Sequence, residues 1–174
     1  KVGAIVENPD LYMYLSGYDN LKITANYYKN ISQNRIEDVI KIIGLEKQIK
    51  DKVSTYSLGM KQRLAIGEAI INQPELLILD EPTNHLDNSM IEYLEKFLIK
   101  WSKGLLMVTH DRYFLERVVN RIVEIDHGQV YNYEANYSKY LELKQLRLET
   151  QLSSQRKRKL FLKKELEWVR AGVQ

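Results

Sequence analysis

The stretch LLILDEPTNHLD, at residues 76–87, constrains this chain more than any other feature. Four consecutive apolar residues at 76–79 run directly into Asp80 and Glu81. An uninterrupted apolar run of this length is typical of a strand that is covered on both faces in a parallel sheet. Open α/β sheets bind their ligands at the carboxyl ends of their strands. The stretch therefore predicts an α/β fold with a functional edge at Asp80 and Glu81.

Two adjacent carboxylates are costly to remove from water unless a cation or a proton donor uses them. In phosphoryl-transfer enzymes a strand-end Asp holds Mg²⁺, and a second residue orients the attacking water. Asp80 and Glu81 are candidates for these two roles. The alternative interpretation is an ordinary strand followed by an acidic turn. The length of the string DEPTNHLD makes that alternative the weaker one.

This string resembles the Walker B motif and the D-loop of ATP-binding cassette (ABC) proteins. The resemblance implies that Asp80 lies beside Mg²⁺, that Glu81 is the catalytic base, and that Leu86 and Asp87 belong to the D-loop. His85, inside the same string, would line a dimer interface. ATP and Mg²⁺ are the cofactors that the resemblance implies.

A second motif, YSLGMKQR at residues 56–63, precedes the acidic pair. Ser57 is a candidate N-cap, and a Gly near a helix N-terminus leaves backbone N–H groups open to an anion. The string stands where ABC proteins have their signature, usually LSGGQ, and differs from it at three of five positions. The resemblance implies that Ser57, Gly59 and Gln62 contact the nucleotide.

Two further residues occupy positions that matter in ABC proteins. A second buried strand is expected at 104–109, followed by His110, which has the spacing of the switch histidine that would hydrogen-bond the γ-phosphate and Glu81. A lone His after a strand is otherwise usually a core or cap residue. Glu7 stands where the family has the Q-loop glutamine. A carboxylate there can reach the metal without the amide donor, so the implied Mg²⁺ ligands are Asp80 and Glu7.

The segment at about 11–75 reads as a helical subdomain that carries the signature helix. A helix is expected at 17–28 and another at 34–43, with Asn34 as its N-cap and Gly44 as its stop. Past the D-loop, the patterns predict in order a helix at 88–101, a helix at 113–119, a strand at 121–125 and a hairpin turn at 126–129.

The net charge of +3 conceals an asymmetry along the chain. Residues 144–174 hold nine Lys and Arg against three Glu, a net charge of +6, so the preceding residues sum to −3. From residue 135 onward the sequence is nearly free of Gly and Pro and predicts one long helix, or two. A basic helix of this kind is either a solvated charged face or a contact for a polyanion.

The carboxy-terminal strings HDRYFLERVVNRIVEI and KKELEWVRAG resemble the end of the first ATPase domain of ABC-F proteins and the start of their interdomain linker. Many ABC-F proteins act on ribosomes, and the resemblance implies a ribosome or tRNA contact through the basic helix at 144–170. Residues 1–80 instead resemble ATPases of drug and bacteriocin exporters. The chain is thus a hybrid of the two branches or a divergent ABC-F protein.

No Walker A motif, G-x-x-x-x-G-K-[ST], occurs in the chain, because none of its eight glycines is followed by Lys. We therefore expect a fragment: a partial ABC nucleotide-binding domain at 1–134, with a truncated RecA-like parallel sheet and the helical subdomain, and the start of a basic helical linker at 135–174. The parent would be an ATPase that forms a head-to-tail sandwich with a second ABC domain. The fragment alone would be inactive.

Two other functions stay open at this point. The chain is either part of the ATPase subunit of an exporter or a non-catalytic remnant that binds RNA or the ribosome. The sequence has no Cys and no apolar run of the roughly 18 residues that span a bilayer. The expected location is the cytoplasm, and any membrane association would come through a partner.

Overall fold

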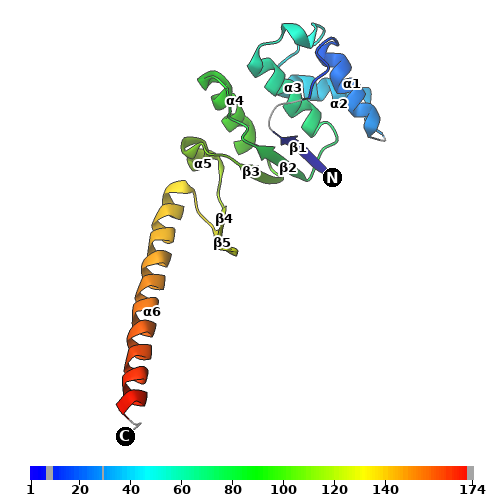
Figure 1. Cartoon of the computed structure of the whole chain (residues 1–174). Helices are drawn as coiled ribbons and strands as arrows, with labels where there is room; N and C mark the ends of the chain where they lie inside the picture. Colours follow the sequence, from blue (N-terminus) through cyan, green and yellow to red (C-terminus); the bar gives the residue numbers. More distant parts are fainter. Residues whose placement is uncertain (7–9, 29, 172–174) are drawn as a thin grey trace. The chain divides into compact units, whose positions relative to one another are not determined.

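The computed structural model describes residues 1–6, 10–28 and 30–171 (Figure 1). The chain divides into two compact units, an amino-terminal unit, Lys1–Phe114, and a carboxy-terminal unit, Leu115–Gln174. The division falls inside helix α5 (Arg112–Val118). It differs from the expected division after residue 134 because the hairpin that precedes residue 134 is held to the long helix by ion pairs.

The amino-terminal unit contains a three-stranded parallel sheet in the order β1-β2-β3, which confirms the predicted α/β fold. The strands are β1 (Val2–Val6), β2 (Leu76–Asp80) and β3 (Gly104–Val108). They pair in register, so that Val6, Asp80 and Val108 end side by side. The register brings the three strand ends to one edge of the sheet.

Only one face of this sheet is buried, which corrects the expectation of strands covered on both sides. Leu77 and Leu79 are buried, but Leu76 and Ile78 are half-buried. β3, expected to be a buried strand, alternates between half-buried and exposed residues. The reason is that α3 packs closely on one face, where a Cβ at Gly3 would lie 2.1 Å from the carbonyl oxygen of Ala69.

The helical subdomain is built from three capped helices. Helix α1 (Gly17–Tyr27) is capped by Ser16, and α3 (Leu58–Ile70) is capped by Ser57, as predicted for Ser57. Helix α2 (Gln33–Ile43) ends at Gly44, whose φ of 65° is the left-handed conformation that favours glycine. The predicted cap at Asn34 is wrong. The hydroxyl of Ser32 caps α2 instead, and because Ser and Asn cap equally well, sequence alone does not choose between them.

Three cations bind carbonyl oxygens at the carboxyl end of α3. Arg35 donates to the oxygens of Ile70 (2.6 Å) and Ile71 (3.1 Å). Lys103 and Lys1 donate to the next carbonyls along the chain, at 3.2 Å each. These bonds satisfy acceptors that a helix end leaves without partners and place positive charge at the negative end of its dipole. They fix the end of α3 next to the start of β2.

The last helix of the amino-terminal unit is α4 (Asn88–Ile99), which buries Met90, Leu94 and Leu98. A short 3-10 helix, η1 (Val53–Thr55), precedes α3.

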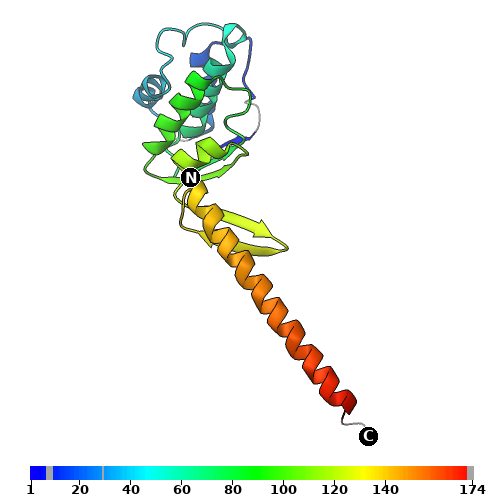
Figure 2. The same ribbon diagram turned by 90° about the vertical axis from the view of Figure 1, so that its left-hand side faces the viewer.

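The carboxy-terminal unit contains the end of α5, a hairpin and one long helix (Figure 2). Strands β4 (Ile122–Asp126) and β5 (Gln129–Tyr133) are antiparallel. His127 and Gly128 join them with φ values of 47° and 74°, the signs of a type I′ turn, as the hairpin prediction requires. Of the predicted one or two helices, the structure has one, α6 (Tyr137–Ala171).

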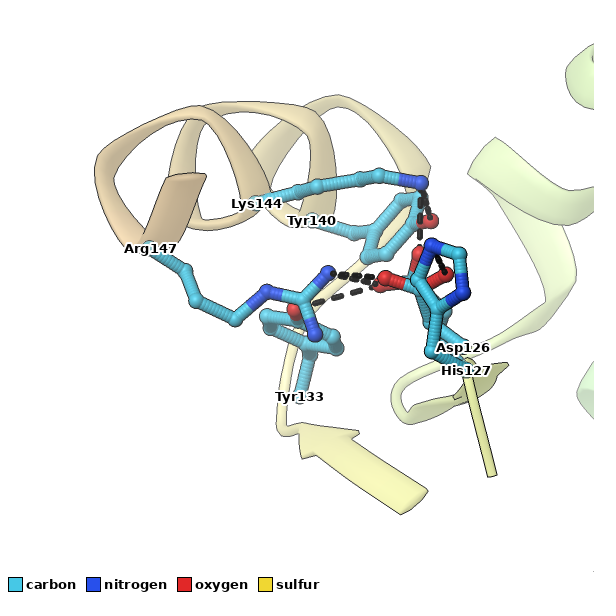
Figure 3. Close-up of polar contacts among 7 residues, drawn as sticks. Asp126, His127, Tyr133, Tyr140, Lys144 and Arg147 are labelled. Carbon is cyan, nitrogen blue, oxygen red and sulfur yellow. Dashed lines mark hydrogen bonds and ion pairs between the residues drawn. The ribbon is translucent and has the colours of Figure 1, made fainter. Parts of the chain in front are cut away.

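A cluster of charged and aromatic side chains joins the hairpin to α6 (Figure 3). Glu124 pairs with Lys144 at 2.5 Å and with Arg147 at 3.2 Å, and it accepts a hydrogen bond from the Tyr133 hydroxyl. The guanidinium of Arg147 lies 3.5 Å from the ring centre of Tyr131. Burial raises the pKa of Glu124, but the hydrogen bond from Lys144 and the two positive charges outweigh it, so that the pKa is below its ordinary value.

Candidate functional site: the carboxyl edge of the parallel sheet

The site begins where β2 ends. Asp80 is the last residue of β2 and is half-buried between Val6 and Val108 of the flanking strands. Glu81 leaves the strand with a φ of 44°, in the left-handed region, while its N–H donates to the oxygen of Val108 at 2.8 Å. This backbone conformation is unfavourable for a residue with a Cβ, and residues of this kind cluster at functional sites.

The carboxylate of Glu81 is held by His110, although 29 residues separate them in sequence. One carboxylate oxygen accepts a hydrogen bond from the backbone N–H of His110 at 3.2 Å, and the other lies 3.4 Å from Nε2 of the imidazole. The Glu81 side chain is 19% exposed and that of His110 is 98% exposed. The arrangement fixes the carboxylate and leaves the imidazole open to a ligand.

The carboxylates of Asp80 and Glu81 are of the kind and number that proteins use to bind Mg²⁺. Mg²⁺ takes hard oxygen ligands and is usually bound through one or two carboxylates, with waters and phosphates completing its shell. Within the described residues, no three His, Cys, Asp or Glu side chains gather closely enough to hold a metal by themselves. Glu7, the other implied ligand, lies outside the described residues. Asp80 is thus the implied ligand whose position the structure describes.

The signature residues lie at the N-terminus of α3. Ser57 is exposed, and its Oγ accepts a hydrogen bond from the N–H of Met60 at 3.3 Å. A Cβ at Gly59 would make only ordinary contact, 3.6 Å from Met90, so the fold of this chain does not itself require glycine there. Gln62 is buried, with 7% of its surface exposed, whereas Ser57 is exposed.

Asp87 caps the neighbouring helix, α4. Its carboxylate accepts hydrogen bonds from the Ser89 hydroxyl at 2.7 Å and from the N–H of Met90 at 2.9 Å, and these bonds hold its pKa below the ordinary value. Because Gly59 adjoins Met90, the N-termini of α3 and α4 lie next to each other. His85, two residues before this cap, is exposed and has a φ of 61°.

The structure thus brings together two groups of the predicted residues. Glu81 and His110 meet at the sheet edge beside Asp80, and Ser57 and Gly59 lie near the start of α4, which Asp87 caps. Sequence reasoning missed the left-handed backbone at Glu81. No local residue type signals it, because Pro82 favours extended backbone with a negative φ at the residue before it.

Comparison with known proteins identifies the family of this chain. Two family models, both described as ABC transporter, match residues 1–84 and 123–172, which together are more than half of the chain. This chain belongs to the ABC family. Its fold is accordingly part of an ABC cassette: a dimeric structure of the ATP-binding cassette MJ0796 in a post-hydrolysis state, bound to ADP and Pi, superposes with a TM-score of 0.65 at 25% identity, over 77% of this chain and 62% of that one.

The curated relatives include uncharacterized ABC transporter ATP-binding proteins and the translational throttle protein EttA. The uncharacterized ABC transporter ATP-binding protein YdbJ of Bacillus subtilis is 44% identical over 133 residues, which are 74% of this chain and 43% of YdbJ. YfmR of the same organism, described in the same words, is 46% identical over 70% of this chain and 19% of its own length. The energy-dependent translational throttle protein EttA of Escherichia coli K12 is 38% identical over 83% of this chain and 25% of EttA.

The chain therefore spans less than half the length of these ABC relatives. Within its described part, every helix is too short or too polar to cross a membrane.

Proposed function

We propose that the protein containing this chain binds and hydrolyses ATP with Mg²⁺. The observation that carries the proposal is the carboxylate of Glu81, fixed by the N–H and the imidazole of His110 at the end of a parallel strand. Asp80 would hold Mg²⁺, which supplies the positive charge that offsets the phosphates. Glu81 would accept a proton from the attacking water, and the exposed imidazole of His110 would donate to the γ-phosphate.

The same proposal assigns Ser57, Gly59 and Asp87 to a nucleotide held mainly by a second ABC domain. In support, Ser57 is exposed at the N-terminus of α3, where helix N–H groups and the helix dipole favour a phosphate. The solved cassette that this chain resembles is dimeric. Because residues 1–174 contain no Walker A motif, we expect this chain alone to show no hydrolysis.

We further propose that the protein is of the ABC-F type and acts on the ribosome in the cytoplasm. Support comes from the similarity to EttA and from α6, a single helix on which four consecutive cations, at residues 156–159, are exposed. A phosphate backbone is the partner that such a charge run fits. The similarity to YdbJ favours a second candidate, the ATPase of an ABC transporter.

Replacement of Glu81 tests the enzymatic proposal. In the full-length protein, Glu81→Gln keeps the shape and loses the base, so we expect ATP to bind as before while turnover falls by about 10²–10⁴-fold. Glu75→Gln, an exposed change at the opposite end of β2, is the matched control and should leave turnover unchanged. Unchanged hydrolysis in the Glu81 variant would remove this residue from the mechanism.

Neutralising the basic run tests the ribosomal proposal. Changing residues 156–159 to Gln should weaken cosedimentation with ribosomes and lower its dependence on salt. A control with four exposed lysines of the other unit changed to Gln should sediment as the native protein does; these are Lys22, Lys41, Lys47 and Lys50. Equal loss in both variants, or no ribosome binding by the native protein, would favour the transporter alternative.

A further inference from the structure

A groove of about 700 Å³ lies in the amino-terminal unit, between α2 and α4 and away from Glu81. Ile42 on α2 and the aromatic residues Tyr93, Phe97 and Trp101 on and just after α4 line it. The Ile42 side chain remains 42% exposed. A concave surface of this size, dominated by aromatic and aliphatic side chains, is in the range of binding sites, about 300–1,000 Å³.

The floor of the groove is fixed by contacts within the chain. The Tyr93 hydroxyl donates to the oxygen of Ile42 at 2.9 Å, and the guanidinium of Arg63 lies 4.0 Å from the Tyr93 ring centre. Trp101 donates through Nε1 to the oxygen of Gly104 at 3.1 Å, and its ring centre is 5.9 Å from that of Phe97. The polar atoms of the floor are thus already satisfied, and what it offers a partner is apolar surface.

The rim of the groove is positive. Arg35, Lys96, Lys100 and Lys103 all line it, and no Asp or Glu of the described residues does. Arg35 and Lys103 are engaged by the carbonyls at the end of α3. Lys96 forms an exposed ion pair with Glu92 at 3.7 Å, and such a pair contributes little to stability. Lys96 and Lys100 stand one helical turn apart, so their charges face the same side of α4.

We propose that this groove binds an acidic amphipathic helix of a protein partner. Such a helix places apolar residues at positions i, i+3, i+4 and i+7 into an apolar groove, and its flanking carboxylates would meet Lys96 and Lys100. Charge complementarity selects an acidic helix over a basic one. A nucleic-acid strand fits less well, because it needs a continuous row of cations along its backbone path and the rim offers two that are not engaged by α3. The proposal is independent of ATP hydrolysis.

Fluorescence of Trp101 provides the test. The chain has two tryptophans, and Trp168→Phe leaves Trp101 as the single reporter in the 174-residue chain. Three synthetic helices of about 18 residues, or five turns, share one Leu/Phe face and carry Glu, Gln or Lys on the flanks. We expect the Glu peptide to change the Trp101 emission and to bind at least about tenfold more tightly than the Gln peptide, and the Lys peptide not to bind.

Charge reversal distinguishes peptide binding in the groove from non-specific attraction between net charges. Lys96→Glu with Lys100→Glu should lose the Glu peptide and gain the Lys peptide, and this gain shows that the variant is folded. Lys157→Glu with Lys159→Glu on α6 changes the net charge equally and should leave peptide binding unchanged. The proposal is overturned if the Glu peptide binds no better than the others, if the groove variant does not reverse the preference, or if only single-stranded oligouridylate changes the Trp101 emission.

Discussion

At the scale of single residues, Glu68 shows how strongly the surroundings of a carboxyl change its pKa. It lies on α3, in the helix that Ser57 caps, and its carboxylate accepts a hydrogen bond from the Thr24 hydroxyl of α1 at 3.0 Å. Burial raises the pKa of Glu68 to about 7, and the bond from Thr24 opposes this shift only in part. Glu68 therefore changes charge near neutral pH, unlike an exposed glutamate with a pKa of about 4.3.

This pKa has a definite effect on stability. A carboxyl whose pKa is raised by folding holds its proton more tightly in the folded state, so stability falls as pH rises from about 4.5 through 7. We expect Glu68→Gln to make the chain more stable at pH 8, by about 1–3 kcal/mol, and to change stability little at pH 5. Urea unfolding at the two pH values measures the difference.

Thr24→Val is the control for the Glu68 prediction. It removes the hydrogen bond that favours the charged carboxylate, so the loss of stability between pH 5 and pH 8 should become larger than in the native chain. A native chain that is equally stable at both pH values would contradict the assigned cause.

The sequence predicted the site better at the level of motifs than at the level of backbone. The carboxyl ends of β2 and β3 had to lie at one edge, because both strands read as parallel and buried, and this alone brings Glu81 near His110. The burial of Gln62 depends on the packing of α3. The left-handed conformation at Glu81 depends on the path of the loop after β2. Neither follows from local residue types.

At the scale of elements, the cluster around Glu124 joins the hairpin to α6. The long helix was predicted from its composition, but its attachment was not, because the partners of Glu124 lie 20 and 23 residues away in sequence. The basic residues of α6 were interpreted together, either as a solvated charged face or as a contact for a polyanion. Lys144 and Arg147 instead pair with carboxylates of their own unit. The exposed charge available to a partner begins further along the helix.

Glu124→Gln should loosen the hairpin from α6. Removing the charge leaves Lys144 and Arg147 without their common partner and should cost about 1.5–3 kcal/mol. We expect faster amide hydrogen exchange in β4, β5 and the first turns of α6. Glu142→Gln, which removes an exposed pair with Lys139, is the matched control and should leave exchange unchanged.

The same cluster sets a pH window. The pKa of Glu124 is lowered, so its contribution is present above its unfolded pKa of about 4.3 and is lost as pH falls further. The hydrogen bond to Glu124 raises the pKa of Lys144, so that contribution is complete below about pH 10.4 and is lost at higher pH. Protection of the hairpin amides, measured against their intrinsic exchange rates at each pH, should therefore be highest between these limits, and a native chain that matches Glu124→Gln at pH 7 would refute the role of the cluster.

At the scale of the whole molecule, the parallel sheet has one apolar face open to solvent. Val2, Val6, Leu106 and Val108 lie on it with 51–63% of their surface exposed. In register, Leu76, Ile78 and Asp80 of the central strand lie between them, so this face is apolar except at Asp80. The sequence predicted buried strands because their composition is that of a covered sheet. The sequence did not predict which element would cover this face.

The open face should make the isolated 174-residue chain associate. We expect it to bind a hydrophobic dye and to sediment as species larger than a monomer, increasingly so at higher concentration. Val6→Thr with Val108→Thr keeps the β-branched shape and should reduce both signals. Val123→Thr with Val130→Thr, at exposed positions of the hairpin, is the control. Dye binding that is the same in both variants would show that the patch is not its cause.

The left-handed backbone at Glu81 opposes the stability of the fold. An L-residue held in the left-handed region costs about 1–2 kcal/mol, and glycine avoids that cost. A library of variants screened for heat resistance should therefore enrich glycine at this codon. The same library screened for the proposed ATP hydrolysis by the full-length protein should retain glutamate, so the two screens should select different residues at position 81.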